Sequence, residues 1–140
     1  MRDSAPVPTE FHWPLRVYIE DTDAGGIVFY VNYLKYMERA RTEFMRKCGF
    51  GKAAIFDDSK LMFVVRRVAV DYRRPAKLDD ELIATARIVE RGTAQLTFEQ
   101  RILRGAEELC GGRVNIACVD QHTLKPKRIP DDLLAALGAV

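Results

Sequence analysis

The longest apolar pattern in this sequence has a helical period, and it constrains the fold more than any other feature. Between residues 32 and 48, apolar side chains recur at steps of three and four residues, which places them on one face of an α-helix. These side chains are Tyr33, Tyr36, Met37, Ala40, Phe44 and Cys48. Asn32 is predicted to cap the start of this helix and Gly49 to end it. A helix with so wide an apolar face has to pack against a second layer.

Most of the remaining sequence alternates with a period of two, which is typical of strands with one buried face. Leu15, Val17 and Ile19 predict a short strand before the helix. Four longer strands are predicted after it, around residues 64–72, 82–88, 94–102 and 114–118. In the first of these four, the side chains expected on one face are Val64, Val68, Val70 and Tyr72.

Short turns that contain Gly92 and Gly105 predict antiparallel neighbours in a meander. Residues 127–137 predict a short C-terminal helix with Pro130 near its first turn. One long helix and such a sheet belong to the α+β class. The arrangement that buries the apolar face of the helix is a curved antiparallel sheet wrapped around it, the hotdog fold. A single sheet leaves a face and two edges uncovered, which predicts that subunits pair.

Length and composition limit the class of protein that this chain can be. The 140 residues suit one domain, predicted over residues 13–140 after a short N-terminal arm at residues 1–12. No apolar run approaches the roughly 20 residues of a membrane-spanning helix, and a net charge of +2 gives no reason to expect a nucleic-acid partner. Cys48, Cys110 and Cys118 lack metal-site spacing, so we expect buried thiols in a reducing compartment. The sequence thus predicts a cytoplasmic protein without a metal site.

Three acids and two glycines, in the stretch EDTDAGG at residues 20–26, stand just before the predicted helix. The first N–H groups of a helix have no intrahelical partner and lie at the positive end of its dipole. Such amides can hold an oxygen that becomes negative during acyl transfer, while a nearby carboxylate attacks the carbonyl or activates a water. Alternatively, the acids are a solvated cluster that the dipole stabilises, and the residues alone favour this simpler interpretation.

A resemblance to a known family favours the catalytic interpretation of this acidic stretch. The stretch RVYIEDTDAGGIVFYVNYLKYMERART at residues 16–42 resembles the signature of the 4-hydroxybenzoyl-CoA thioesterase superfamily. It is most similar to the acyl-CoA thioesterases encoded with the Tol-Pal cell-envelope system of bacteria. The likeness continues through FVVRRVAVDYRRPAKLDDEL and RGTAQLTFEQRI, at residues 63–82 and 91–102. It implies a hotdog dimer, usually assembled into a homotetramer, that hydrolyses acyl-CoA without a metal or bound cofactor.

The resemblance also implies roles for residues of the acidic stretch. Asp23 matches the family's catalytic carboxylate, which acts as nucleophile or as general base, and Asp21 is expected to be a turn or helix-end partner. The thioester carbonyl is expected to lie against backbone amides of Gly26, Ile27 and Tyr30. Many Tol-Pal-type relatives have histidine where this chain has Tyr30, whereas the hydroxybenzoyl-CoA branch has tyrosine and uses its main-chain N–H.

Coenzyme A carries phosphates, so basic residues are expected near the mouth of the site. The candidates that the resemblance implies for coenzyme A are Val64, Val65, Arg66 and Arg91, with Arg67 as a further one. Each arginine could instead be an ordinary solvated charge on a strand.

Two other functions stay open from the sequence. The first is a non-catalytic hotdog module that binds acyl-CoA or acyl carrier protein, which would not need Asp23. The second is a hydratase or dehydratase, which pairs a histidine with an acid. No histidine occurs between residues 20 and 45, which argues against the second function. Acyl carrier protein is also considered as a donor of the acyl group to a thioesterase.

Overall fold

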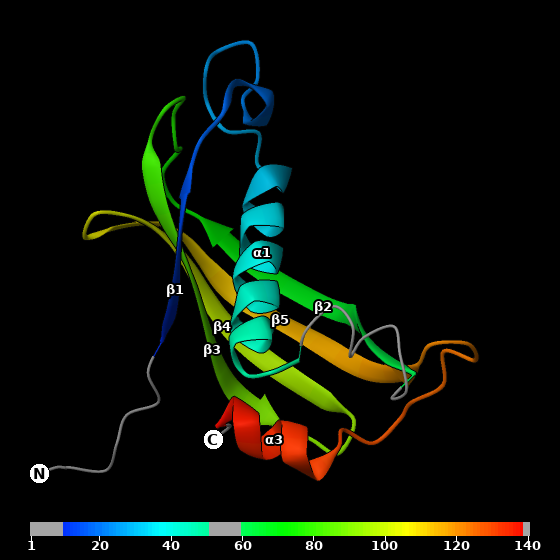
Figure 1. The fold of residues 1–140 in the computed structure, drawn as a ribbon. Coiled ribbons are helices and arrows are strands. Elements are labelled where there is room, and N and C mark those ends of the chain that lie inside the picture. Colours follow the sequence, from blue (N-terminus) through cyan, green and yellow to red (C-terminus); the bar gives the residue numbers. More distant parts are fainter. Residues whose placement is uncertain (1–9, 51–59, 139–140) are drawn as a thin grey trace, which may run out of the picture.

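The long helix α1 lies across one face of a five-stranded antiparallel sheet (Figure 1). The computed structural model describes residues 10–50 and 60–138. The strands are β1 (Phe11–Arg16), β2 (Leu61–Tyr72), β3 (Glu81–Arg91), β4 (Gln95–Arg104) and β5 (Glu107–Asp120), in the spatial order β1-β3-β4-β5-β2. The helices are a 3-10 turn η1 (Ile19–Asp21), α1 (Val31–Lys47) and α3 (Asp131–Leu137). The predicted α+β hotdog architecture is confirmed.

The apolar face of α1 is buried against the sheet as the helical period predicts. Tyr36, Met37 and Ala40 have no exposed surface, and the Phe44 ring meets the Phe98 ring of β4 edge to face at 5.9 Å. Burial of such side chains contributes roughly 1.5–3 kcal/mol for each large one. The helix end is also as predicted, because Gly49 takes a φ of 97°, which favours glycine.

A buried glutamine joins α1 to the sheet. Gln100 lies on the inward face of β4 and has no exposed surface. Its Nε2 donates to the carbonyls of Met37 in α1 and Thr85 in β3, both at 2.9 Å. Its Oε1 accepts from Arg41 Nη1, also at 2.9 Å. All its hydrogen-bonding groups are therefore used, so a polar side chain is accommodated where the strand pattern has an apolar position.

The start of the chain differs from the prediction. The predicted strand through Leu15, Val17 and Ile19 is wrong at its end, because β1 stops at Arg16 and Ile19 lies in η1 with 75% of its surface exposed. β1 begins at Phe11, so residues 11 and 12 pair with β3 although they were assigned to the N-terminal arm. Residues 1–9 of that arm lie outside the described residues.

The helix start and the face of β2 also differ. α1 begins at Val31 with Tyr30 as its N-cap, so Asn32 is inside the helix rather than its cap. In β2, the register shifts between Val65 and Arg67. This bulge adds one residue to the strand, so Val64 and Val68 face opposite sides although they are four residues apart. The meander is correct for β3, β4 and β5, whereas β2 lies at the far edge beside β5.

Within residues 10–50 and 60–138, no helix combines the length and the apolar character needed to cross a membrane.

Candidate active site

The loop between η1 and α1 is docked on the connection between β2 and β3. The Val28 N–H donates to the Ala76 carbonyl at 2.9 Å, and the Leu78 N–H donates to the Gly26 carbonyl at 3.1 Å. Gly26 has a φ of 79°, a left-handed conformation that glycine adopts without strain. The loop and the start of α1 therefore lie together at one end of the sheet (Figure 1).

Asp23 lies on this loop with one carboxylate oxygen held and the other available. Its Oδ1 accepts the Gly25 N–H at 2.8 Å and, more weakly, the Ile27 N–H at 3.4 Å. Its Oδ2 has no hydrogen-bond partner in the part of the chain that the structure describes. The side chain is exposed, so a reactant can reach this second oxygen.

Two adjacent backbone amides at the start of α1 have no acceptor in the part of the chain that the structure describes. Between Gly25 and Tyr33, the other N–H groups all donate within the chain: Gly26 to Asp23 O at 3.0 Å and Phe29 to Asp21 O at 3.0 Å are examples. Tyr30 and Val31 have no backbone or side-chain acceptor among residues 10–50 and 60–138. Helix N-terminal amides in this position are suited to hold an anionic oxygen.

These hydrogen bonds reduce the number of predicted amides that are available to hold a substrate oxygen. The amides of Gly26 and Ile27 already donate to Asp23, whereas that of Tyr30 is free. The Val31 amide was missed, because the sequence pattern placed the helix start two residues too late. The roles of all these residues stay predictions.

Asp21 is buried beneath the loop. Only 6% of its surface is exposed, and it accepts the Tyr18 N–H at 2.9 Å on Oδ2 and the Asn32 side-chain amide at 2.8 Å on Oδ1. The expected role of Asp21 as a turn and helix-end partner agrees with these contacts. Its neighbour Tyr36 has a buried hydroxyl without a hydrogen bond among the described residues. Burial, with the nearby Asp21 charge, raises the pKa of Tyr36.

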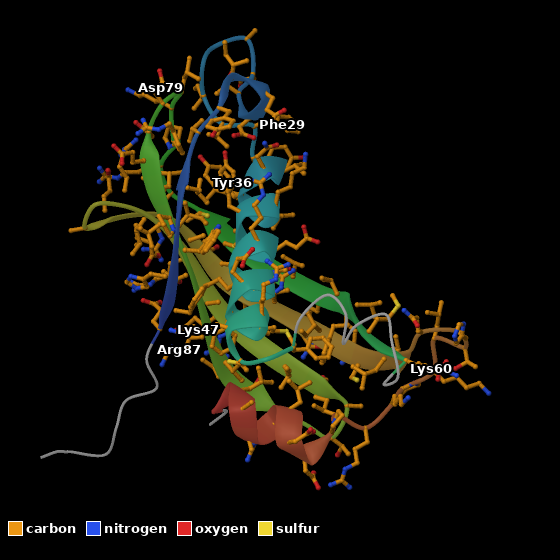
Figure 2. All side chains as sticks on the ribbon, in the orientation of Figure 1. Phe29, Tyr36, Lys47, Lys60, Asp79 and Arg87 are labelled. Atoms are coloured by element: carbon orange, nitrogen blue, oxygen red, sulfur yellow. The ribbon has the colours of Figure 1, made fainter. Side chains whose placement is uncertain are left out.

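Exposed aromatic rings border the same end of α1. Phe29 and Tyr30 are in contact at 5.0 Å between ring centroids, and Tyr30 meets Tyr72 of β2 edge to face at 5.9 Å. Tyr30 is 59% exposed and Tyr72 is 44% exposed. Figure 2 shows Phe29 beside the start of α1, at the same end of the molecule as Asp79. Large exposed rings of this kind commonly mark a binding or subunit surface.

A groove between α1 and β2 extends from the helix start. One part has a volume of about 280 Å³ and is bordered by Val31, Val65 and Arg41. It continues into a second part of about 310 Å³, whose apolar walls include Met45 and Phe63. Burial lowers the pKa of Arg41, whose guanidinium donates to Gln100. The groove offers mainly apolar surface that starts next to the two free amides.

The opposite face of the sheet carries a basic groove of about 500 Å³, here called the arginine groove. Its basic residues are Arg66, Arg67, Arg91 and Arg113. The bulge in β2 places both Arg66 and Arg67 on this face. Arg66 is held there because its Nη1 donates to Gln95 at 2.8 Å and to Asn115 at 3.1 Å.

The structure therefore brings together the three arginines predicted from the sequence, Arg66, Arg67 and Arg91. The two predicted valines do not line this groove. Val65 faces the groove beside α1, whereas Val64 pairs with Ala117 and points to the other side of the sheet. Arg113 was missed as a member of the arginine groove. It alternates with the inward-facing Val114, so the period of β5 could have revealed it.

Within one chain, the arginine groove and Asp23 lie far apart. Ile27 of the loop bridges Lys77, just before β3, whereas Arg91 is the last residue of β3. The 11 residues of β3 separate the two ends by about 35 Å, at roughly 3.3 Å per residue. Asp23 therefore lies far from the Arg91 end of the arginine groove in the same chain, and the two are not expected to contact one coenzyme A molecule.

Comparisons with known proteins identify thioesterases as relatives of this chain. Residues 17–137 match the family model described as the thioesterase-like superfamily. The chain is 43% identical over 126 residues to the acyl-CoA thioesterase YbgC of Haemophilus influenzae, an alignment that covers 90% of this chain and 93% of that protein. It is 41% identical over 128 residues to the acyl-CoA thioester hydrolase YbgC of an Escherichia coli strain, covering 91% and 95% of the two chains.

A solved structure has the same fold as this chain. The crystal structure of a probable thioesterase from Bartonella henselae superimposes with a TM-score of 0.83 at 35% sequence identity. The match covers 87% of this chain and 100% of that one. The similarity therefore extends over nearly all of both proteins.

Proposed function

This chain belongs to the thioesterase-like superfamily, and on that premise we propose that it is an acyl-CoA thioesterase. The reaction is hydrolysis of the thioester to a free acid and coenzyme A. The observation that carries the proposal lies at one helix start: Asp23 Oδ2 and the amides of Tyr30 and Val31 have no hydrogen-bond partner among the described residues. Two relatives named for this activity, at 43% and 41% identity, support it.

In the proposed mechanism, the free amides of Tyr30 and Val31 donate to the thioester oxygen. They stabilise the negative charge that develops there, and one such donor is typically worth about 3–4 kcal/mol. Asp23 Oδ2 then attacks the carbonyl carbon or takes a proton from an attacking water. The C–S bond breaks, the sulfur leaves as the coenzyme A thiolate and takes up a proton. Where Asp23 attacks, the product of this step is a mixed anhydride, and water then breaks its acyl–oxygen bond to release the acid and restore the Asp23 carboxylate. Where Asp23 acts as a base, the attacking water itself becomes part of the acid product. Gly26 and Ile27 support the reaction indirectly, because their amides fix the conformation of Asp23.

The test is release of free thiol from a panel of short, long and aromatic acyl-CoAs, with acyl carrier protein thioesters as a separate arm. Turnover of at least one acyl-CoA supports the proposal, and the best substrate identifies the acyl pocket. Hydrolysis restricted to acyl carrier protein thioesters would change the proposed substrate, and no turnover at all would contradict the proposal.

The active assembly is proposed to be at least a homodimer joined along β2. β2 is an edge strand, and unpaired strand edges pair readily with a second copy. It exposes Val65, Val68 and Tyr72, at 50%, 42% and 44% of their surfaces. Antiparallel pairing of two β2 strands around a two-fold axis sets the Tyr72 end of one chain, where the loop lies, beside the Leu61 end of its partner, which is the end of the sheet that carries Arg91. This pairing brings Asp23 of one subunit toward the Arg91 end of the arginine groove of the other.

Replacing Val68 by aspartate is expected to produce a monomer that has lost most thioesterase activity, because a charge is then buried in the proposed interface. Analytical ultracentrifugation measures the state of assembly, and thiol release measures the activity. Leu124→Asp is the matched control, since Leu124 is 60% exposed in a turn after β5 and should leave both unchanged. A Val68→Asp protein that stays dimeric would exclude this interface.

The arginine groove is proposed to bind the phosphates of coenzyme A. Arg91→Glu is expected to raise KM for acyl-CoA about tenfold or more while kcat stays within about twofold, since reversing a charge at a phosphate weakens binding without touching the thioester. Steady-state kinetics at two salt concentrations provide the measurement, because added salt should reduce the difference. Arg128→Glu, an exposed position outside the groove, is the control. An unchanged KM would remove Arg91 from the site.

The cysteines support a reducing compartment, which we propose is the cytoplasm. Cys110 and Cys118 are buried free thiols. Burial raises the pKa of Cys110 to about 12 and that of Cys118 to about 11, so both stay protonated and unreactive near neutral pH. A homotetramer, an acyl carrier protein partner and a link to the Tol-Pal system stay predictions from the sequence resemblance.

A further inference from the structure

Asp21 connects the parts of the proposed active site that must hold a fixed geometry. Its side chain accepts from the Tyr18 amide, before the loop, and from the Asn32 side chain, in the first turn of α1. Its backbone carbonyl accepts from the Phe29 amide at 3.0 Å, at the end of the loop. One residue thus ties both ends of the loop to each other and to the helix.

These contacts surround the two free amides. Tyr30 and Val31 lie between Phe29 and Asn32, and both of these flanking residues are hydrogen-bonded to Asp21. Asp23 is only two residues from Asp21 on the other side. The position of the two amide donors relative to the Asp23 carboxylate therefore depends on Asp21.

The hydrogen bond between Asp21 and Asn32 is buried. Asp21 and Asn32 are only 6% and 7% exposed, so water hardly competes for their hydrogen bond. Asp21 has no ion pair within residues 10–50 and 60–138, and a buried carboxylate without a cation costs stability. Its hydrogen bonds to Tyr18 and Asn32 are therefore better explained by what they position than by a contribution to folding stability.

We infer that Asp21, through Asn32 and the Phe29 amide, is a positioning residue that sets the two amides of Tyr30 and Val31 against Asp23 for the reaction. This inference rests on the proposed thioesterase function. Asp21 touches no substrate and moves no proton. It acts by holding the geometry in which the amides meet the thioester oxygen while Asp23 reaches the carbon.

The experiment compares Asn32→Asp with the exchanged pair Asp21→Asn/Asn32→Asp. The single variant sets two carboxylates against each other, and the resulting shift of the loop is expected to lower kcat about 100-fold, with KM within about threefold. The double variant restores one carboxylate facing one carboxamide, and it should recover at least about tenfold of that loss. Glu20→Gln, at an exposed acid beside Asp21, is the control and should keep wild-type kinetics.

Amide hydrogen exchange of the peptide that contains residues 24–31 is measured on the same proteins. Exchange should be faster in Asn32→Asp and return to the wild-type rate in the exchanged pair. This readout tests the positioning role even for a wild type that hydrolyses no acyl-CoA, an outcome that would contradict the proposed function alone. Should Asn32→Asp not fold, Asn32→Ala removes the donor without adding charge and is expected to lower kcat about tenfold at constant KM.

Two results would overturn the inference. One is a folded Asn32→Asp or Asn32→Ala protein with the wild-type exchange rate in residues 24–31. The other is a loss of kcat that follows the loss of thermal stability and that the exchanged pair does not restore, since this would indicate a purely structural role.

Discussion

Asp23→Asn is expected to lower kcat for acyl-CoA by at least about 100-fold, because it removes the only group proposed to attack the thioester or activate water. Asparagine retains the size of the side chain and an oxygen that can accept the Gly25 and Ile27 amides, as Asp23 Oδ1 does. The loop should therefore keep its conformation. The free Oδ2 is replaced by an NH₂ group, which is neither a nucleophile nor a base. KM should change little, since the arginine groove and the free amides are untouched.

The measurement is steady-state thiol release, with the melting temperature of each protein determined alongside. Asp79→Asn is the matched control: the same substitution at an exposed aspartate at the same end of the molecule (Figure 2). Asp79 has a φ of 70°, a conformation that asparagine tolerates, so this variant should remain folded and active. Wild-type turnover in Asp23→Asn would contradict the proposed mechanism, whatever the outcome for the other residues of the loop.

The elements of the fold could be predicted because each has a clear period of its own. The apolar face of α1 and the inward residues of β3, such as Leu82 and Ala84, are buried as the pattern predicts. The bulge in β2 could not be predicted, since it depends on pairing with β5, which is distant in the sequence. Gln100 was overlooked for a similar reason. Its burial depends on acceptors in two other elements, which no local pattern reveals.

The candidate site shows the same division between local and long-range information. Asp23 could be proposed as the catalytic carboxylate from its motif, and its place on a loop before the helix follows from the glycines and the helical period. The sequence could not reveal which amides of the loop are available to a substrate, because this depends on where the neighbouring amides donate. The Val28 amide, for example, donates to the carbonyl of Ala76, nearly 50 residues away. Asn32 was misassigned as a cap because asparagine is common there, whereas its side chain in fact donates to Asp21.

A glycine in β5 controls the position of the strand on which the proposed dimer depends. Gly112 lies opposite Val70 of β2. A Cβ atom at Gly112 would be 2.2 Å from the Ala69 carbonyl oxygen and 2.8 Å from Val70 Cα. Both are backbone atoms, so the clash cannot be relieved by rotation of a side chain. β2 and β5 would have to separate at this point.

Gly112→Ala is therefore expected to destabilise the protein by about 3 kcal/mol, at the upper end of what forced overpacking costs, and to lower the melting temperature by roughly 10 °C. Differential scanning calorimetry measures this effect. Gly111→Ala is the matched control, since its Cβ would approach closely only a side-chain atom, Oε2 of Glu108 at 2.9 Å, which can move by side-chain rotation. Because β2 carries Val68 and the bulge at Arg66, the Gly112 variant should also lose dimers and activity at temperatures where it is still folded. A variant with wild-type stability would show that β2 can move away from β5 without cost. The position of the edge strand in the proposed interface would then not depend on Gly112.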